Sequence, residues 1–465
     1  MMKKHTPKED TTNLEADRLA RVAANSKESA QDLQKPKLSR MTLTCLVVLA
    51  GLVIWTLTSL LGGGISEYES ALIGYYQSGD YENALTAAEA LQQKDAGVRL
   101  AYLVAAEIQL RNGDDGAARA LYQKALDAPK GSAAETARAL MGLGRIASLK
   151  NEGDQAMDFY RQASKVVPDD STAYLSQAML LEKQGHTEKA LSLLEKARNL
   201  ASGNQTIAAF ARELRTKAAI KTDAAKQKRI DTLVKELLAG MKKPAPALPS
   251  DGWTSQPLTI WIIDFTTQGY SLREGDETLL VSGMTDRLLQ HGQVQIVERA
   301  LLDKLLVELK LSTTRLTDQR TALALGKLLA ARLIVTGNMV HSGPHTQVSL
   351  RMFETETGRI TAALNETAGS TAPVSALAET LTANLIQKIE ANYPLRGKIE
   401  AVSADSATLN IGSRVGVAIG QTFKVPRQDI LLEVSAVMAD QCTASIIKGQ
   451  STAAVDQRVE IVTLP

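Results

Sequence analysis

GDYENALTAAEAL, residues 79–91, is the stretch that decides the fold, because its pattern returns three more times along the chain. The later copies keep its order of polar, small and apolar residues and are GDDGAARALYQKAL (113–126), NEGDQAMDFYRQAS (151–164) and GHTEKALSLLEKAR (185–198). The copies align on four alanines spaced 34, 38 and 34 residues apart, which are Ala84, Ala118, Ala156 and Ala190. A period of this length predicts a solenoid in which each unit is a pair of helices packed on the next pair.

Small residues recur where the two helices of a pair must approach closely. Ala106, Gly144 and Ala178 hold this position in the later units, and Pro129 and Pro168 close the second and third units. This pattern resembles the tetratricopeptide repeat. The resemblance implies an α-solenoid of about four repeats over residues 65–201. The first unit matches least well, because it has a leucine, Leu72, where the others have a small residue.

The first helices of such pairs line a concave face. The positions expected to point into this face are Tyr76, Glu107, Arg111, Arg138, Arg145 and Lys183. Four of the six are basic, so one interpretation is a partner-binding groove for an acidic or C-terminal peptide segment. The alternative interpretation is a solvated face or an intramolecular docking surface.

One long charged helix is expected after the repeats. It runs from Gln205 to about Lys242, within residues 202–243, and is expected to cap the last helix pair. The proline-rich sequence Pro244-Ala-Pro-Ala-Leu-Pro249 then predicts a linker over residues 244–256.

The hydrophobic pattern changes after the linker. Apolar runs predict strands within LTIWIIDF (258–265), VQIVE (294–298), RLIVTGNMV (332–340) and TQVSLRMFETETG (346–358), the last two forming a hairpin. Helical patterns lie between and after them, at 277–290, 300–311 and 374–393, and a further helix is expected to end in LGKLLAA (325–331). Strands separated by helices and followed by a hairpin predict a mixed sheet with helices packed on it.

Three motifs occur in this region, IVERALLDKLLVELKLS (296–312), LGKLLAARLIVTGNM (325–339) and RMFETETGRI (351–360). Together they resemble the curli-secretion-channel family (CsgG-like) over residues 257–395. That family is itself similar to flagellar outer-membrane-associated proteins and to lipoprotein activators of peptidoglycan synthases. The resemblance implies ring assembly, and in curli channels a pore made by membrane-inserted β-hairpins.

The chain departs from the curli channels in two respects. It has a helical anchor in place of a lipidation signal. Its hairpin around Ser342-Gly343-Pro344 is expected to be short, whereas a membrane-inserting arm needs about 9–11 residues. Pore formation by this chain is therefore not expected from the resemblance alone.

The last part of the chain, residues 396–465, consists of short alternating stretches separated by turns that contain Gly412, Gly416, Gly420 and Pro426. Such spacing predicts a small β-barrel or sandwich. The stretch resembles the C-terminal barrel of flagellar assembly proteins.

The N-terminal region predicts the location of the protein. Met41 to Leu61 is an uncharged run long enough for one transmembrane helix, assigned to residues 41–62. Nine Lys and Arg residues precede it and none lies between Gly62 and Gln93, so the N-terminus is expected to be cytoplasmic and the bulk of the chain periplasmic. Residues 1–40 predict a disordered cytoplasmic tail. The location is thus the inner membrane, crossed once.

No arrangement of residues points to catalysis. There is no phosphate-binding loop, and GLGRIAS (142–148) falls inside a repeat helix. His341 and His345 flank a predicted turn without further ligands, and Asp264 stands alone after its strand. We therefore expect no catalytic, cofactor-binding or metal site. The net charge of +2 also argues against a nucleic-acid partner.

Taken together, the sequence predicts a multidomain α + α/β protein with a single N-terminal transmembrane helix, an α-solenoid, a mixed-sheet CsgG-like domain and a small β-barrel. The predicted function is a non-enzymatic scaffold for protein or peptide partners in envelope biogenesis or secretion. Two alternatives stay open, a ring-forming component of an outer-membrane secretion channel and an activator of a peptidoglycan synthase. Homo-oligomer formation is open as well.

Overall fold

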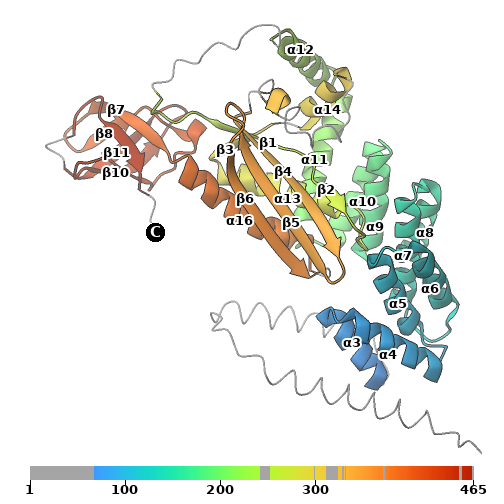
Figure 1. The fold of residues 1–465 in the computed structure, drawn as a ribbon. Coiled ribbons are helices and arrows are strands. Elements are labelled where there is room, and N and C mark those ends of the chain that lie inside the picture. The colour runs from blue at the N-terminus through green and yellow to red at the C-terminus, as the bar shows by residue number, and fades with distance from the viewer. Residues whose placement is uncertain are drawn as a thin grey trace, which may run out of the picture.

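The computed structural model describes residues 67–240, 252–297, 299–309, 323–326, 329, 331–369, 372–449 and 453–462. Figure 1 shows a stack of helices at one end, a sheet with helices in the middle and a small barrel at the other end. The predicted tail and transmembrane helix, residues 1–62, lie outside the described residues, as does most of the linker. Among the described helices, none is both long and apolar enough to cross a membrane.

The repeats form four helix pairs, as the sequence predicts. Their helices are α3 (Glu67–Ser78), α4 (Tyr81–Lys94), α5 (Arg99–Arg111), α6 (Asp115–Asp127), α7 (Ala133–Leu149), α8 (Gly153–Val166), α9 (Ser171–Lys183) and α10 (Thr187–Leu200). The four aligned alanines are all fully buried. They lie on the second helix of each pair, where a small side chain lets the two helices approach.

Side-chain volumes within the pairs are complementary. Gly144 faces the ring of Tyr160, and a Cβ on this glycine would lie 2.5 Å from that ring. In the first pair the large residue is on the other helix, since Leu72 shares a buried cluster with Ala88. The weak match of the first repeat is therefore an exchange of volumes between two positions, which preserves the total volume of the core.

The predicted capping helix is in fact two helices, α11 (Gln205–Thr222) and α12 (Ala224–Gly240). The break lies at Asp223, whose backbone is extended and whose carboxylate accepts a hydrogen bond from the Ala225 N–H. The expectation of one continuous helix was wrong because an aspartate can cap a new helix start in the middle of a helical pattern. Helix α11 packs on α10, as a cap would, and also on α13.

The central domain has a mixed sheet with the strand order β3-β1-β4-β5-β6, in which β2 also pairs with β4. The strands are β1 (Leu258–Ile262), β2 (Thr266–Gln268), β3 (Val294–Ile296), β4 (Leu333–Ser342), β5 (His345–Glu354) and β6 (Ile360–Gly369). The helices are α13 (Asp276–His291), α14 (Arg299–Glu308) and α16 (Val374–Asn392). β1 pairs in parallel with β3 and β4, whereas β4, β5 and β6 are antiparallel.

Alternate residues of β1 and β4 pack into two different buried clusters, one on each face of the sheet. Ile260 and Ile262 pack with residues of α13 and α16. Trp261 and Ile334 pack on the opposite face with residues of α12 and α14. The sheet is thus covered on both sides, which explains why β1 reads as an unbroken apolar run.

Two features of this domain differ from the sequence expectation. The strands β2 and β6 were not predicted, because neither has a clear apolar alternation. The hairpin between β4 and β5 was expected to be short, but each of its strands has 10 residues, most of them at least partly buried. The helix predicted to end within residues 325–331 agrees with the described residues, since 323–326 are helical and Leu329 lies in a turn.

The C-terminal barrel is closed, with the order β10-β11-β8-β7-β12-β9. Its strands are β7 (Arg396–Val402), β8 (Ser406–Leu409), β9 (Thr422–Lys424), β10 (Leu431–Val437), β11 (Cys442–Lys448) and β12 (Arg458–Ile461). Cys442 belongs to its core and is 1% exposed. Burial raises the pKa of the Cys442 thiol to about 11, so this cysteine is a packing residue and a poor nucleophile at neutral pH.

Candidate functional site: the concave face of the repeats

The first helices of the repeats carry a cluster of predicted partner-binding residues. Tyr76, Glu107 and Arg138 meet there from α3, α5 and α7. The Tyr76 hydroxyl donates to Glu107, and Arg138 donates to both carboxylate oxygens of Glu107 over 2.9 Å. The Glu107 side chain is 7% exposed and that of Arg138 is 45% exposed. Only the arginine of this cluster therefore presents much of its side chain to solvent.

Arg111 also lies in this part of the face, but it is buried. Its guanidinium group is 5.3 Å from the ring centres of both Tyr76 and Tyr81, and it donates a hydrogen bond to the Tyr81 hydroxyl. These contacts between a cation and two aromatic rings stabilise the junction of the first two repeats. Burial lowers the pKa of Arg111. The prediction of an open basic groove does not fit this residue.

Arg145 on α7 holds a segment of the central domain. It donates from Nε to the backbone carbonyl of Ser271 over 3.0 Å and from Nη1 to the Glu274 carboxylate over 2.7 Å. The Tyr160 hydroxyl donates to the same carboxylate over 3.2 Å. The side chains of Arg145 and Glu274 are 12% and 9% exposed. Burial and the nearby carboxylate raise the pKa of Tyr160, which keeps its hydroxyl protonated as a donor.

Residues 269–275, which we name the docked segment, connect β2 to α13 and make further contacts with the repeats. Tyr270 and Leu272 pack against the buried cluster of the second and third pairs. A Cβ on Gly113, in the turn between α5 and α6, would lie 3.0 Å from the Tyr270 ring. Gly275 lies against Met179 of α9. The docked segment thus runs along three successive repeats.

Bonds within the central domain shape the docked segment. Asp276 accepts hydrogen bonds from the Ser271 hydroxyl over 2.9 Å and from Arg273 Nε over 3.1 Å. Arg273 also donates to the backbone carbonyl of Ala372 over 3.0 Å. These bonds fold the segment back on the start of α13, which leaves the Ser271 carbonyl and the Glu274 carboxylate for Arg145.

Of the remaining predicted residues, Lys183 is exposed at the end of α9 and is not part of either cluster.

The tip of the β4–β5 hairpin reaches the other end of the repeats. A Cβ on Gly79, in the turn between α3 and α4, would lie 2.6 Å from Cβ of Pro344. The central domain therefore touches both the first repeat and the last repeat.

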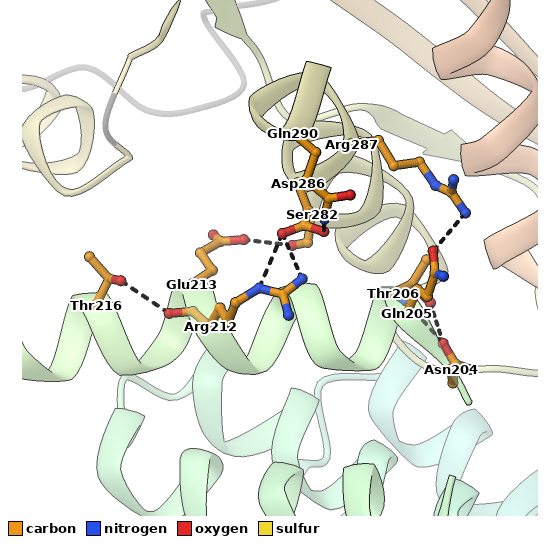
Figure 2. A network of polar contacts seen from close by, with 10 residues as sticks. All are labelled: Asn204, Gln205, Thr206, Arg212, Glu213, Thr216, Ser282, Asp286, Arg287 and Gln290. Carbon is orange, nitrogen blue, oxygen red and sulfur yellow. Dashed lines mark hydrogen bonds and ion pairs between the residues drawn. The ribbon is translucent and has the colours of Figure 1, made fainter. Parts of the chain in front are cut away.

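A second contact joins the repeats to the central domain through α11 and α13. Figure 2 shows Glu213 accepting a hydrogen bond from the Ser282 hydroxyl over 2.6 Å, beside an ion pair of 2.6 Å between Arg212 and Asp286. Beneath these polar bonds, one continuous hydrophobic cluster contains Phe210 of α11 together with residues of α10, α13 and the sheet. The two domains therefore share a core.

The sequence placed Arg145 on the correct surface but did not identify what binds it. Tyr270, Ser271 and Glu274 are not among the residues that the sequence singles out. The sequence did contain a signal for this loop. The loop follows the carboxyl end of β2, which pairs in parallel with β4. Open α/β sheets place their binding loops at this edge. Among the described residues, no group of three or more His, Cys, Asp or Glu side chains could hold a metal ion.

Comparison with known families agrees with the two main resemblances. Residues 265–343 match the family described as curli production assembly/transport component CsgG. Residues 73–133 match the tetratricopeptide repeat. The chain thus contains tetratricopeptide repeats and a CsgG-like domain, followed by the closed six-stranded barrel. Among curated proteins, none matches the chain.

Solved structures are similar to parts of the chain. The LpoB C-terminal domain from Salmonella enterica is 16% identical, with a TM-score of 0.22, and the match covers 30% of this chain and 94% of that one. PilF of Pseudomonas aeruginosa is 19% identical, with a TM-score of 0.30, over 38% of this chain and 80% of that one. YrrB, a tetratricopeptide protein, is 18% identical, with a TM-score of 0.28, over 35% and 81%.

Proposed function

We propose that this protein is a membrane-anchored scaffold that binds protein partners in the cell envelope, through its repeats and its CsgG-like domain. The observation that carries the proposal is the contact of Arg145 and Tyr160 with the docked segment. These two side chains recognise a main-chain carbonyl and a carboxylate, which is how a repeat surface would hold a peptide. Tetratricopeptide repeats and CsgG-like domains are typically non-catalytic, and we propose no enzymatic activity.

The proposed location rests on the N-terminal sequence. The uncharged run from Met41 to Leu61 has the length of a bilayer span, and the Lys and Arg residues lie on its N-terminal side. By the positive-inside rule, the repeats, the central domain and the barrel would lie in the periplasm. A role in envelope biogenesis or secretion follows from that location together with the match to the curli component family.

A second candidate function is a ring-forming channel component, and one feature of the sheet favours self-association. Strand β6 is 10 residues long and, in the part that the structure describes, pairs on one side only, with β5. It contains no Lys, Arg or Pro, and its one charged residue, Glu366, accepts a hydrogen bond from Asn384 of α16. Ring-shaped particles that conduct ions across a bilayer would favour this candidate over a closed scaffold.

The proposal is tested by chemical cross-linking of the full-length protein in its own cells, followed by fractionation and identification of the attached proteins. The expected result is recovery in the membrane fraction together with a reproducible set of envelope proteins. A variant that lacks residues 1–62 serves as the matched control, and it should leave the membrane fraction.

Two outcomes would contradict the proposal. Recovery of the full-length protein in the soluble fraction would show that residues 41–62 do not anchor it to a membrane. Recovery in the membrane as a monomer that carries no other protein would remove the scaffold role.

A further inference from the structure

The docked segment has the properties of a peptide ligand that belongs to the same chain. It begins at Gly269 and ends with Gly275 before α13, and both glycines have left-handed backbones, with φ of +80° and +74°. Between them, Tyr270 fills an apolar contact and Glu274 enters the ion pair with Arg145. Because the backbone turns sharply at both glycines, the five residues between them can project away from β2 and α13.

The contact between the docked segment and the repeats has an apolar part, made by Tyr270 and Leu272, and a polar part, centred on the buried ion pair of Arg145 with Glu274. A buried ion pair contributes less to stability than a well-packed apolar contact of the same size, because both charges lose water. It does contribute specificity, since a carboxylate without the arginine, or the arginine without a carboxylate, is strongly disfavoured there. The ion pair of Arg145 with Glu274 therefore determines which segment binds, as contacts in a recognition site do, more than it holds the two domains together.

The contact that holds the two domains together lies elsewhere, at helix α11, and we call it the seam. Helix α11 joins the repeats to the central domain through Ile207, Phe210 and Leu214, which are at most 2% exposed and lie in the shared hydrophobic cluster. The ion pair of Arg212 with Asp286 and the bond of Glu213 with Ser282 border this seam (Figure 2). The docked segment can therefore leave the concave face while the two domains stay joined.

We infer that the concave face around Arg145 and Tyr160 is a binding site for an acidic peptide segment, that residues 270–274 occupy it in cis, and that a partner binds by displacing them. This inference rests on the proposed function, because it assumes that partners use the repeats. The partner segment would supply a carboxylate for Arg145, a main-chain carbonyl three residues before it, and an aromatic or apolar side chain four residues before it. These are the positions of Glu274, Ser271 and Tyr270.

Tethering makes the docked segment a strong competitor. A ligand on a short linker acts at an effective concentration on the order of millimolar. A free peptide with the same contacts binds poorly while the docked segment is in place. Removing the contacts of the docked segment, and leaving the repeats unchanged, should therefore open the site to a free peptide.

The test uses the full-length protein in detergent and a fluorescein-labelled peptide of the sequence QGYSLREGDE, residues 268–277. Binding is followed by fluorescence polarisation to the native chain and to the variant Tyr270→Ala/Glu274→Gln. The variant is expected to bind the peptide about 100-fold more tightly than the native chain does. Adding Arg145→Gln to the variant should abolish binding, whereas adding Lys183→Gln, at an exposed position outside the site, should not change it.

Equal affinity of the native chain and the variant would overturn the inference, and so would the absence of binding to a variant whose circular dichroism is native. If the double variant does not fold, Glu274→Gln alone decides, because it keeps the packing of Tyr270. Cross-linking to envelope proteins in cells is a separate readout. A chain that captures partners but fails the peptide test would retain the proposed scaffold function and lose only this inference.

Discussion

Replacing Arg145 with alanine is expected to expose the bond between Arg273 and Glu274 to trypsin, at a rate about 100-fold above that of the native chain. The substitution removes both bonds from the repeats to the Ser271 carbonyl and the Glu274 carboxylate. Breaking a buried ion pair costs roughly 3–5 kcal/mol, and each 1.4 kcal/mol changes an equilibrium about tenfold. Proteolysis of a transiently opened segment follows that equilibrium.

The cleavage is measured by the appearance of fragments 1–273 and 274–465 in the mass spectrum. Because Arg145→Ala leaves the cleaved bond unchanged, the two rates are directly comparable. Arg138→Ala is the matched control, since the hydrogen bonds of Arg138 go to Glu107, within the repeats. A cleavage rate that does not change in Arg145→Ala would contradict the docking. The exchanged pair Arg145→Glu/Glu274→Arg should restore much of the protection.

The same substitution at two glycines should change stability in opposite directions. In Gly142→Ala, the new methyl group would lie 2.2 Å from Cζ of Tyr122, a buried ring with 1% exposure. Such overpacking costs about 1–3 kcal/mol, which exceeds the gain of about 1 kcal/mol in helix propensity. In Gly74→Ala, nothing lies within 4 Å of the new methyl group, so only the gain remains.

Thermal unfolding followed by circular dichroism at 222 nm measures both variants, because the repeats supply much of the helix. Gly142→Ala should lower the midpoint of the helical transition, and Gly74→Ala, in the exposed middle of α3, should raise it. Since Tyr122 causes the clash, adding Tyr122→Leu to Gly142→Ala should recover part of the loss. Equal behaviour of the two alanine variants would mean that the close packing of α7 on α6 is wrong.

The repeats and the barrel could be predicted from the sequence because their signals are local. The spacing of Ala84, Ala118, Ala156 and Ala190 reports contacts between neighbouring helices, which close sequence neighbours must make. The barrel strands alternate in the same local way. The break at Asp223 had a local signal too, an aspartate in a capping position, but the charged pattern on both sides concealed it.

The docked segment could not be predicted, because its contacts depend on how two domains approach each other. Arg145 and Glu274 are 129 residues apart in the sequence. Neither residue is unusual alone, since an arginine on a repeat helix and a glutamate in a loop are both common on protein surfaces. The sequence left a peptide groove and an intramolecular docking surface as alternatives. The contacts of Arg145 favour intramolecular docking at the third repeat, and the exposed Lys183 takes no part in it.

The central claim is that the docked segment occupies the concave face of its own chain, and photo-cross-linking in the cell tests it most directly. A diazirine side chain is introduced in place of Leu272, which packs against the cluster formed by α5, α6 and α7. After irradiation, the account predicts a cross-link within one chain, to peptides from residues 99–149. Cross-links that reach only other proteins, or other parts of this chain, would contradict it.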